Sequence, residues 1–250
     1  TARKQTEEEL RRHDAALAAV TEASRQLLRG EGSEQAIADA LAAVGGAIGA
    51  DRAYIFENRT DDRGRLLCSQ RYEWVAPGVT PQLDNRELQD LPLAELYPRW
   101  FELMHQGLPV CGAVGDFPAA ERPLLEEQHI KSLLVMPIYL DGAFWGFIGF
   151  DDCRTERAWG RLESEALQVA AGMFGSAVLR TRAQAQLRTG EERLSLALAG
   201  ADLGMWDWNV ATGAVVFDER WAAMLGYRLD EIRPHVDAWG ELLHPDDAPQ

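Results

Sequence analysis

The chain has 250 residues, a length that favours two small domains or one large one. An apolar fraction of 46% and a charged fraction of 26% are those of a soluble globular protein and exclude a disordered chain. The 40 acidic and 25 basic side chains give a formal charge of −15, which repels nucleic-acid phosphates and anionic lipids. We therefore expect no nucleic-acid partner and no membrane insertion.

The three cysteines are scattered along the chain at positions 68, 111 and 153. They form no CxxC pair and no cluster with zinc-ligand spacing, so we expect no metal site. An odd, dispersed set of thiols is typical of a reducing compartment. The polar N-terminus also lacks the apolar core of a signal peptide. These features predict a cytoplasmic protein.

Residues 4–29 have the pattern of a helix, which Gly30-Glu31-Gly32 would end. Two sets of residues recur every seven positions and predict a helix–helix seam: Leu10, Leu17 and Ser24, and His13, Val20 and Leu27. The alternative is a helix that packs against its own domain. Ser33 is placed to cap a second helix over residues 34–48, which has one apolar face.

Two strands are predicted next, over residues 53–58 and 66–75, joined by a turn at 61–64. In the second strand, alternation places one set of side chains on a single face: Leu66, Cys68, Gln70, Tyr72 and Trp74. Ser69, Arg71 and Glu73 would then lie on the wetter face. A long polar loop is expected over 77–92. It is followed by a helix over 93–106 that starts properly around Pro98, a short strand over 110–114 and a helix over 119–128.

Residues 132–150 form an apolar run of nineteen residues with one charge, Asp141. Pro137 and the central Asp141-Gly142 argue against a membrane helix, and Asp-Gly between two apolar runs favours a β-hairpin. An apolar stripe then predicts a helix over 161–180 that continues to Leu194. Strands at 203–210 and 214–218 and helical turns at 221–225 and 229–232 follow.

The order of these elements resembles the GAF domain family over residues 30–180. The similarity is strongest in the segment Ala50-Asp51-Arg52-Ala53-Tyr54-Ile55-Phe56 and in residues 132–150 with the Gly149-Phe150-Asp151-Asp152 that ends them. The resemblance implies an α+β fold, with an antiparallel sheet and helices on both faces. One face would carry a bundle of the terminal helices, and the other would form a small-molecule pocket. It also implies dimerisation through the end helices.

Residues 194–247 resemble the first half of a PAS domain. The residues that carry this similarity are Ala201-Asp202-Leu203-Gly204-Met205-Trp206-Asp207-Trp208, Trp221, Met224-Leu225-Gly226-Tyr227 and His244-Pro245-Asp246-Asp247. A complete PAS sheet would need further strands, so we expect the sequence to be a piece of a longer protein. The predicted domains are a signalling helix (1–30), a GAF domain (31–180), a connector (181–193) and a partial PAS domain (194–250).

Aromatic side chains and nearby polar groups on one face of the sheet are the candidate ligand contacts. They are Tyr54, Phe56, Cys68, Gln70, Tyr72, Trp74, Trp100, Cys111, Phe117 and His129. Core packing alone is the alternative for any of the aromatic residues. Some GAF relatives carry a bilin on a Cys-His pair, but Gly112 follows Cys111, so a bilin is not expected, and the sequence identifies no particular cofactor. The adjacent Asp151 and Asp152 would point to opposite faces of a strand and cannot share a metal.

We expect no catalytic residue in these 250 residues. Ala-Ala-Leu follows His13-Asp14, where a phosphoacceptor site would have Arg and Pro, and there is no nucleotide-binding glycine motif or GGDEF. The expected function is therefore sensory. A small molecule or redox change in the GAF pocket would act through helices on a downstream histidine kinase or diguanylate cyclase of a bacterial two-component or related system. The alternatives are a ligand-free GAF/PAS dimerisation module and a GAF-type methionine sulfoxide reductase.

Overall fold

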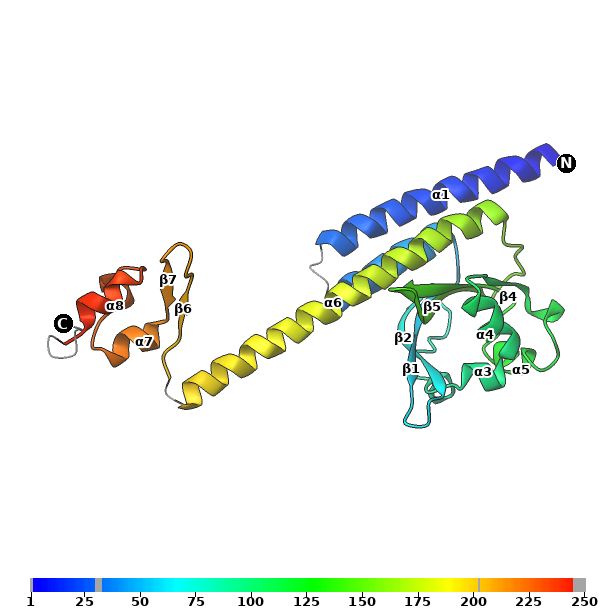
Figure 1. Cartoon of the computed structure of the whole chain (residues 1–250). Coiled ribbons are helices and arrows are strands. Elements are labelled where there is room, and N and C mark those ends of the chain that lie inside the picture. Colours follow the sequence, from blue (N-terminus) through cyan, green and yellow to red (C-terminus); the bar gives the residue numbers. More distant parts are fainter. Residues whose placement is uncertain (1, 30–32, 202, 245–250) are drawn as a thin grey trace. The chain divides into compact units, whose positions relative to one another are not determined.

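The computed structural model describes residues 2–29, 33–201 and 203–244 (Figure 1). Three predicted features lie wholly or partly outside these ranges: the helix end at Gly30-Glu31-Gly32, Asp202, and Pro245-Asp246-Asp247. The chain divides into two compact units, residues 1–184 and 185–250, and each is described by itself.

The first unit is built on a five-stranded antiparallel sheet in the order β2-β1-β5-β4-β3. Its strands are β1 (Arg52–Thr60), β2 (Leu66–Val75), β3 (Val110–Ala113), β4 (Ser132–Leu140) and β5 (Ala143–Asp152). The predicted hairpin over residues 132–150 is confirmed as β4 and β5. Its turn residues Asp141 and Gly142 have φ values of 50° and 80°, as a tight hairpin turn requires.

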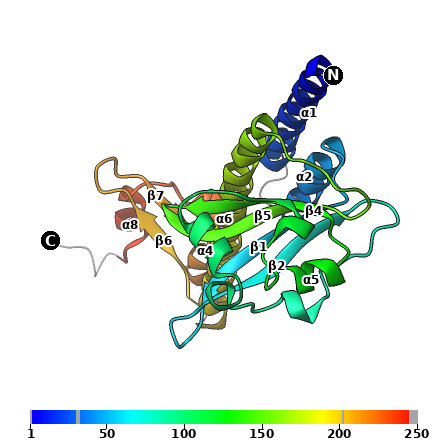
Figure 2. The same ribbon diagram turned by 90° about the vertical axis from the view of Figure 1, so that its right-hand side faces the viewer.

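Two helices, α2 (Glu34–Ala47) and α6 (Arg161–Ala201), cover one face of this sheet, and α1 (Ala2–Arg29) packs against these helices (Figure 1 and Figure 2). Ser33 caps α2 by accepting a hydrogen bond from the Ala36 backbone N–H, as predicted. Ile37, Leu41 and Phe174 on the helices pack against Ile148 and Phe150 on the sheet, and all five side chains are fully buried. This layer is the larger of the two cores of the unit.

Short helices and loops cover the other face. They are η1 (Arg86–Leu88), α3 (Leu93–Leu96), α4 (Pro98–His105), η2 (Val114–Asp116) and α5 (Arg122–Glu127). The helix predicted over 93–106 has its proper start at Pro98, as expected, and the residues before it form the separate short helix α3, because the chain is non-helical at Tyr97. Proline disfavours the helical conformation in the residue before it. A second apolar core lies beneath this layer.

The heptad pattern of α1 is divided between two environments. Val20 and Leu27 are buried in the helical core of their own unit, which agrees with the second interpretation of this helix. Leu10 and Leu17 are 54% and 41% exposed. The inward half of the pattern therefore has its helix partners within the domain, and a contact of Leu10 and Leu17 with a second copy stays a prediction.

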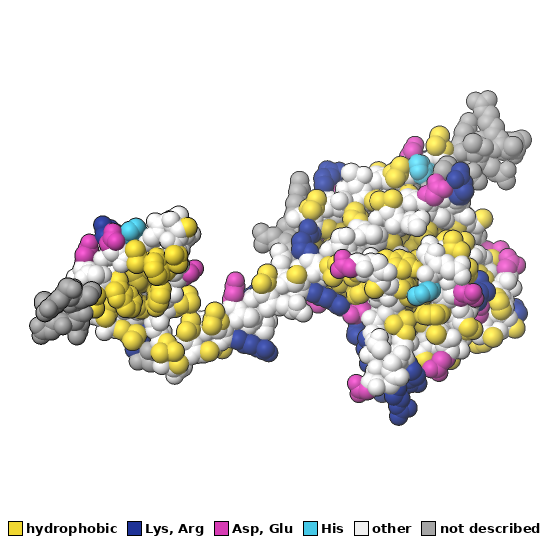
Figure 3. Space-filling view, in the orientation of Figure 1, with side chains coloured by type: hydrophobic (Ala, Val, Ile, Leu, Met, Phe, Trp, Pro, Cys, Tyr) yellow, Lys and Arg dark blue, Asp and Glu magenta, His cyan; other side chains and the backbone are white. Residues whose placement is uncertain are grey.

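The second unit contains the hairpin β6 (Trp206–Trp208) and β7 (Val215–Phe217), then α7 (Glu219–Met224), η3 (Leu229–Glu231) and α8 (Asp237–Leu242). Its strands are shorter than predicted. Five buried apolar residues form its core, while Trp206, Trp208 and Trp239 are 40–48% exposed. Figure 3 shows the hydrophobic side chains gathered on one face of this unit. Among the helices of the described ranges, none is long and apolar enough to cross a membrane.

Candidate ligand-binding cavity

A cavity of about 60 Å³ lies between the sheet and the layer of short helices in the first unit. The sheet supplies its floor through residues of β1, β2 and β5, and the opposite wall comes from α3, α4, α5 and the loop before α3. Most of the lining is apolar. This is the face on which the sequence predicted a small-molecule pocket.

Two aromatic rings form the centre of the floor. Phe56 of β1 and Phe147 of β5 are paired across the two strands and stack with their centroids 4.7 Å apart. Tyr54 lies beside them, with its ring perpendicular to that of Phe56. Gly149, the residue opposite Tyr54, makes room for this ring, since a Cβ atom there would lie 2.2 Å from it. The glycine thus permits close packing within a buried strand.

A buried polar group closes one end of the cavity. The Tyr54 hydroxyl donates a 2.9 Å hydrogen bond to Asp151, and the Arg52 guanidinium lies 3.4 Å from the other Asp151 oxygen. Arg52 also donates to the backbone carbonyl of Gln128, 3.1 Å away. Arg52 and Asp151 face each other because they are register partners of β1 and β5. Each is only 1% exposed, so the charges are held together out of water.

Burial sets the proton affinities at this end. It raises the pKa of Asp151 to about 7, against the lowering effect of the Arg52 charge and the Tyr54 hydrogen bond. Burial, followed by the nearby Asp151 charge, also raises the pKa of Tyr54 well above its ordinary value. The phenol is therefore a neutral donor at pH 7, and Asp151 titrates within the physiological range.

Gln70 of β2 has the most unusual polar side chain in the lining. It is paired with Phe56 across the strands, lies on the cavity face and is 3% exposed. Both its side-chain oxygen and its side-chain nitrogen are buried without a hydrogen-bond partner among the described residues. A buried amide with neither end satisfied costs free energy, so a native protein keeps one where it has a use.

The outer wall is fixed by Glu121, which is 5% exposed. It accepts hydrogen bonds from the Trp100 indole at 2.8 Å and from the Arg99 guanidinium at 2.5 and 2.9 Å. Burial alone would raise the pKa of Glu121, but the hydrogen bonds from Arg99 and Trp100 outweigh it and lower that pKa. The carboxylate therefore stays ionised and holds the Trp100 ring against the cavity.

Five of the ten predicted contact residues line the cavity: Tyr54, Phe56, Cys68, Gln70 and Trp100. Three others lie elsewhere in the domain. Phe117 packs edge-on against Trp100 in the core behind the wall. Cys111 on β3 and His129 after α5 are exposed and do not line the cavity.

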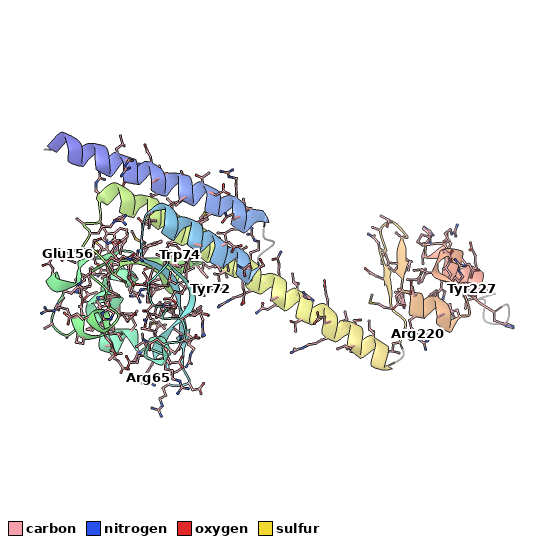
Figure 4. All side chains as sticks on the ribbon, turned by 180° about the vertical axis from the view of Figure 1, so that it is seen from behind. Arg65, Tyr72, Trp74, Glu156, Arg220 and Tyr227 are labelled. Atoms are coloured by element: carbon pink, nitrogen blue, oxygen red, sulfur yellow. The ribbon has the colours of Figure 1, made fainter. Side chains whose placement is uncertain are left out.

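Tyr72 and Trp74 were assigned to the wrong face. The pairing of β1 with β2 shifts between Ile55 and Phe56, so that Tyr72 opposes Ile55 whereas Gln70 opposes Phe56. This β-bulge leaves Arg71 as an extra residue and reverses the alternation beyond it. Tyr72 and Trp74 therefore pack against the helical core, as Figure 4 shows, and Glu73 lines the cavity instead.

Arg52, Asp151, Phe147 and Tyr97 also line the cavity but were not among the predicted contacts. The sequence did predict that Asp151 and Asp152 point to opposite faces of their strand, because side chains alternate along a strand. Only Asp151 faces this cavity. Arg52 lay within the segment that carried the family resemblance. Their pairing depends on the register of two strands about 100 residues apart, which no local pattern specifies.

A profile of the GAF domain family matches residues 33–178, more than half of the chain. The chain belongs to the GAF domain family. This match covers the sheet, α2, the layer of short helices and the cavity; it begins after α1 and ends inside α6. It does not include the second unit.

One curated relative is the methanogenesis regulatory histidine kinase FilI of Methanothrix harundinacea. The two sequences are 46% identical over 179 residues, which are 72% of this chain and 20% of the relative. The matched segment is thus about a fifth of that kinase.

Solved GAF domains share the fold at low sequence identity. A phycocyanobilin-bound GAF domain from a cyanobacterial phytochrome superposes with a TM-score of 0.52 at 20% identity, covering 69% of this chain and 96% of that one. The chromophore-binding domain of a bacteriophytochrome from R. palustris gives a TM-score of 0.54 at 13% identity, covering 67% and 62%. Together with the family match, these structures establish a GAF-like α+β fold.

Proposed function

We propose that this chain is the sensory region of a cytoplasmic signal-transduction protein and binds a small molecule in its GAF cavity. The observation that carries the proposal is the cavity itself, in which a buried amide lacks a partner. Binding would favour one arrangement of the sheet and its helices over another, and α1 and α6 would pass that bias to an output domain. The 46% identity to part of a histidine kinase favours a kinase output over a diguanylate cyclase.

The volume of the cavity argues against a bilin. Sites for drug-sized ligands usually enclose at least about 300 Å³, and this cavity measures about 60 Å³. Cys111, the cysteine considered for bilin attachment, lies on β3 and does not line the cavity. We therefore propose a ligand much smaller than a tetrapyrrole.

The properties of the three thiols argue against redox sensing and against methionine sulfoxide reductase activity. Burial raises the pKa of Cys68 to about 12 and that of Cys153 to about 11, and it also raises the pKa of Cys111. All three are therefore protonated at pH 7, whereas thiol chemistry needs the thiolate. Cys68 on β2 and Cys111 on β3 lie on opposite edges of the sheet, about 19 Å apart at the usual strand spacing, too far for a disulfide.

We propose that residues 194–250 are the first part of a PAS domain. A hairpin followed by short helices is consistent with the sequence resemblance. The exposed tryptophans of β6 would be covered by the remaining strands of such a domain. A structure of a longer form of the protein, in which those strands pair elsewhere, would contradict this assignment.

Ligand binding can be tested by filling the cavity. Cys68→Phe places a ring in it, and Cys111→Phe adds the same bulk at an exposed position. The chain and both variants are equilibrated with the small-molecule fraction of a cell extract and examined by native mass spectrometry and hydrogen exchange. We expect a bound small mass and altered exchange in α1 and α6 for the chain and for Cys111→Phe, but not for Cys68→Phe.

Identical results for all three proteins would contradict sensing in this cavity. They would favour the alternative, a ligand-free GAF/PAS dimerisation module.

A further inference from the structure

Gln70 offers both halves of a hydrogen-bonded pair to whatever fills the cavity. A carboxamide has one acceptor oxygen and two N–H donors in a plane, and both ends of this one are unpartnered among the described residues. The same holds if the oxygen and nitrogen of the Gln70 amide are assigned the other way round, because both atoms are buried without a hydrogen-bond partner among the described residues. The complementary partner presents a donor and an acceptor side by side.

The charges in the lining already have partners within the protein. Arg52 is paired with Asp151, and the Glu73 carboxylate accepts hydrogen bonds from the backbone N–H groups of Gln82 and Leu83 at 2.8–2.9 Å. An ionic ligand would leave water for a mostly apolar cavity in which Arg52 already faces Asp151 and the Glu73 carboxylate is already hydrogen-bonded, which is costly. An uncharged ligand avoids this penalty.

The volume limits the ligand to a few atoms. A cavity needs roughly 10–15 Å³ for each water-sized group, so the 60 Å³ found here holds about four to six such groups. The stacked Phe56 and Phe147 rings and the neighbouring leucines leave an apolar remainder. A short alkyl group attached to one polar, planar end fits this lining.

From these three constraints we infer that the cavity binds a small uncharged carboxamide whose amide pairs with Gln70 and whose short alkyl end contacts Phe56 and Phe147. The inference rests on the proposed sensory function and narrows it to one chemical class. Such a ligand satisfies both ends of Gln70 at once, which explains why a polar side chain is retained in an apolar strand face. Arg52, which also lines the cavity, has a further unpartnered N–H at its Nε atom.

Acetamide and acetone make a matched pair of probe molecules. They have the same number of non-hydrogen atoms and the same carbonyl, but only acetamide has an N–H donor. Titration of each into the isotope-labelled chain, followed by NMR shifts of residues around the cavity, gives the two affinities. We expect acetamide to bind at least tenfold more tightly than acetone, with a sub-millimolar dissociation constant, the range open to so small a ligand.

Gln70→Leu removes the amide and keeps the approximate volume of the side chain. We expect it to abolish the preference for acetamide and to leave acetone binding within about threefold. Gln70→Glu keeps the shape but loses the N–H donors, and we expect it to weaken acetamide binding at least tenfold. Circular dichroism of both variants confirms that they fold.

The inference is overturned if acetamide and acetone bind equally, if neither binds, or if Gln70→Leu keeps the preference. In that case, the cavity-filling experiment separates the two proposals. If the chain binds a ligand from cell extract and Cys68→Phe does not, the sensory function is supported and only the proposed ligand class is wrong. Failure of the cavity-filling experiment together with clear binding of acetamide would instead remove the sensory role and retain the binding site.

Discussion

Gln70 stands out at the residue scale because it lowers the stability of the fold it belongs to. Its amide left water on folding and gained no hydrogen bond from the described residues. Unsatisfied buried polar groups cost about 1–3 kcal/mol each. Residues of this kind concentrate at functional sites, where activity and stability compete.

We therefore predict that Gln70→Leu stabilises the ligand-free chain by about 1–3 kcal/mol. Urea unfolding followed by tryptophan fluorescence measures the change. The control is Gln89→Leu, since Gln89 donates a hydrogen bond to the Gln70 backbone and is only half-buried. We expect this control to be neutral or slightly destabilising. A Gln70→Leu variant less stable than the parent would mean that the amide has a structural role.

Asp151 predicts a pH dependence of stability. Its pKa is about 7 in the folded protein, against the ordinary value of 3.8 that applies to the unfolded chain. Between these two pH values the folded protein therefore keeps a proton that the unfolded chain has lost. The stabilisation from this proton is complete at low pH and is lost as pH rises to about 7. Between pH 4 and pH 8 it amounts to about 2–4 kcal/mol.

The measurement is the free energy of unfolding between pH 5 and pH 8 for the chain and for Asp151→Asn. We expect the parent to lose more stability than the variant as pH rises across this window. Asp141→Asn, at the exposed turn of the hairpin, is the control and should follow the parent. Equal slopes for the parent and Asp151→Asn would show that Asp151 does not titrate there.

At the scale of elements, the packing of the two central strands requires a residue without a side chain, Gly149. Gly149 on β5 faces the Tyr54 ring on β1, and this contact lets the Tyr54 hydroxyl reach Asp151. A methyl group at this position has no space unless the ring moves. Movement of the ring would break the hydrogen bond and open the polar end of the cavity.

Gly149→Ala should therefore destabilise the chain by about 1–3 kcal/mol, the usual cost of overpacking. Thermal or urea unfolding measures it. Gly172→Ala is a matched control because Gly172 lies within α6 with no other atom near the added methyl group. We expect this change to stabilise the helix by about 0.5–1 kcal/mol. Similar effects at both positions would contradict the packing described for Tyr54.

At the scale of the whole molecule, we propose that the chain forms dimers through its terminal helices. Leu17 on α1 and Val169 on α6 are 41% and 60% exposed, although both helices also contribute buried residues to the core of the first unit. Val20 and Leu27 face inward and are buried in the core of their own domain. Only the outward-facing residues of the helix are therefore available to contact a second copy of the chain. Exposed apolar positions on helices are typical of such contacts.

We predict that Leu17→Asp combined with Val169→Asp converts a dimer into a monomer, as measured by light scattering at high protein concentration. Ala18→Asp adds the same charge at the neighbouring exposed position of α1 and should leave the dimer intact. Val20→Asp is not a useful test, because a buried charge would unfold the helix layer. A chain that is monomeric before any substitution would contradict the proposal.

The sequence by itself determined the elements whose signals are local. The Asp141-Gly142 turn, the Ser33 cap, the apolar faces of α2 and α6 and the family resemblance all depend on neighbouring residues, and each is found in the structure. The same local alternation placed Cys68 and Gln70 on the cavity face, where they lie.

Only the tertiary structure decided the remainder of the site. The bulge at Arg71 sends Tyr72 and Trp74 to the other face, because an extra residue reverses every later side chain and leaves no mark in the alternation itself. The pairing of Arg52 with Asp151 depends on the register of β1 and β5. The lack of a partner for Gln70 depends on every element packed around it, and no stretch of sequence contains that information.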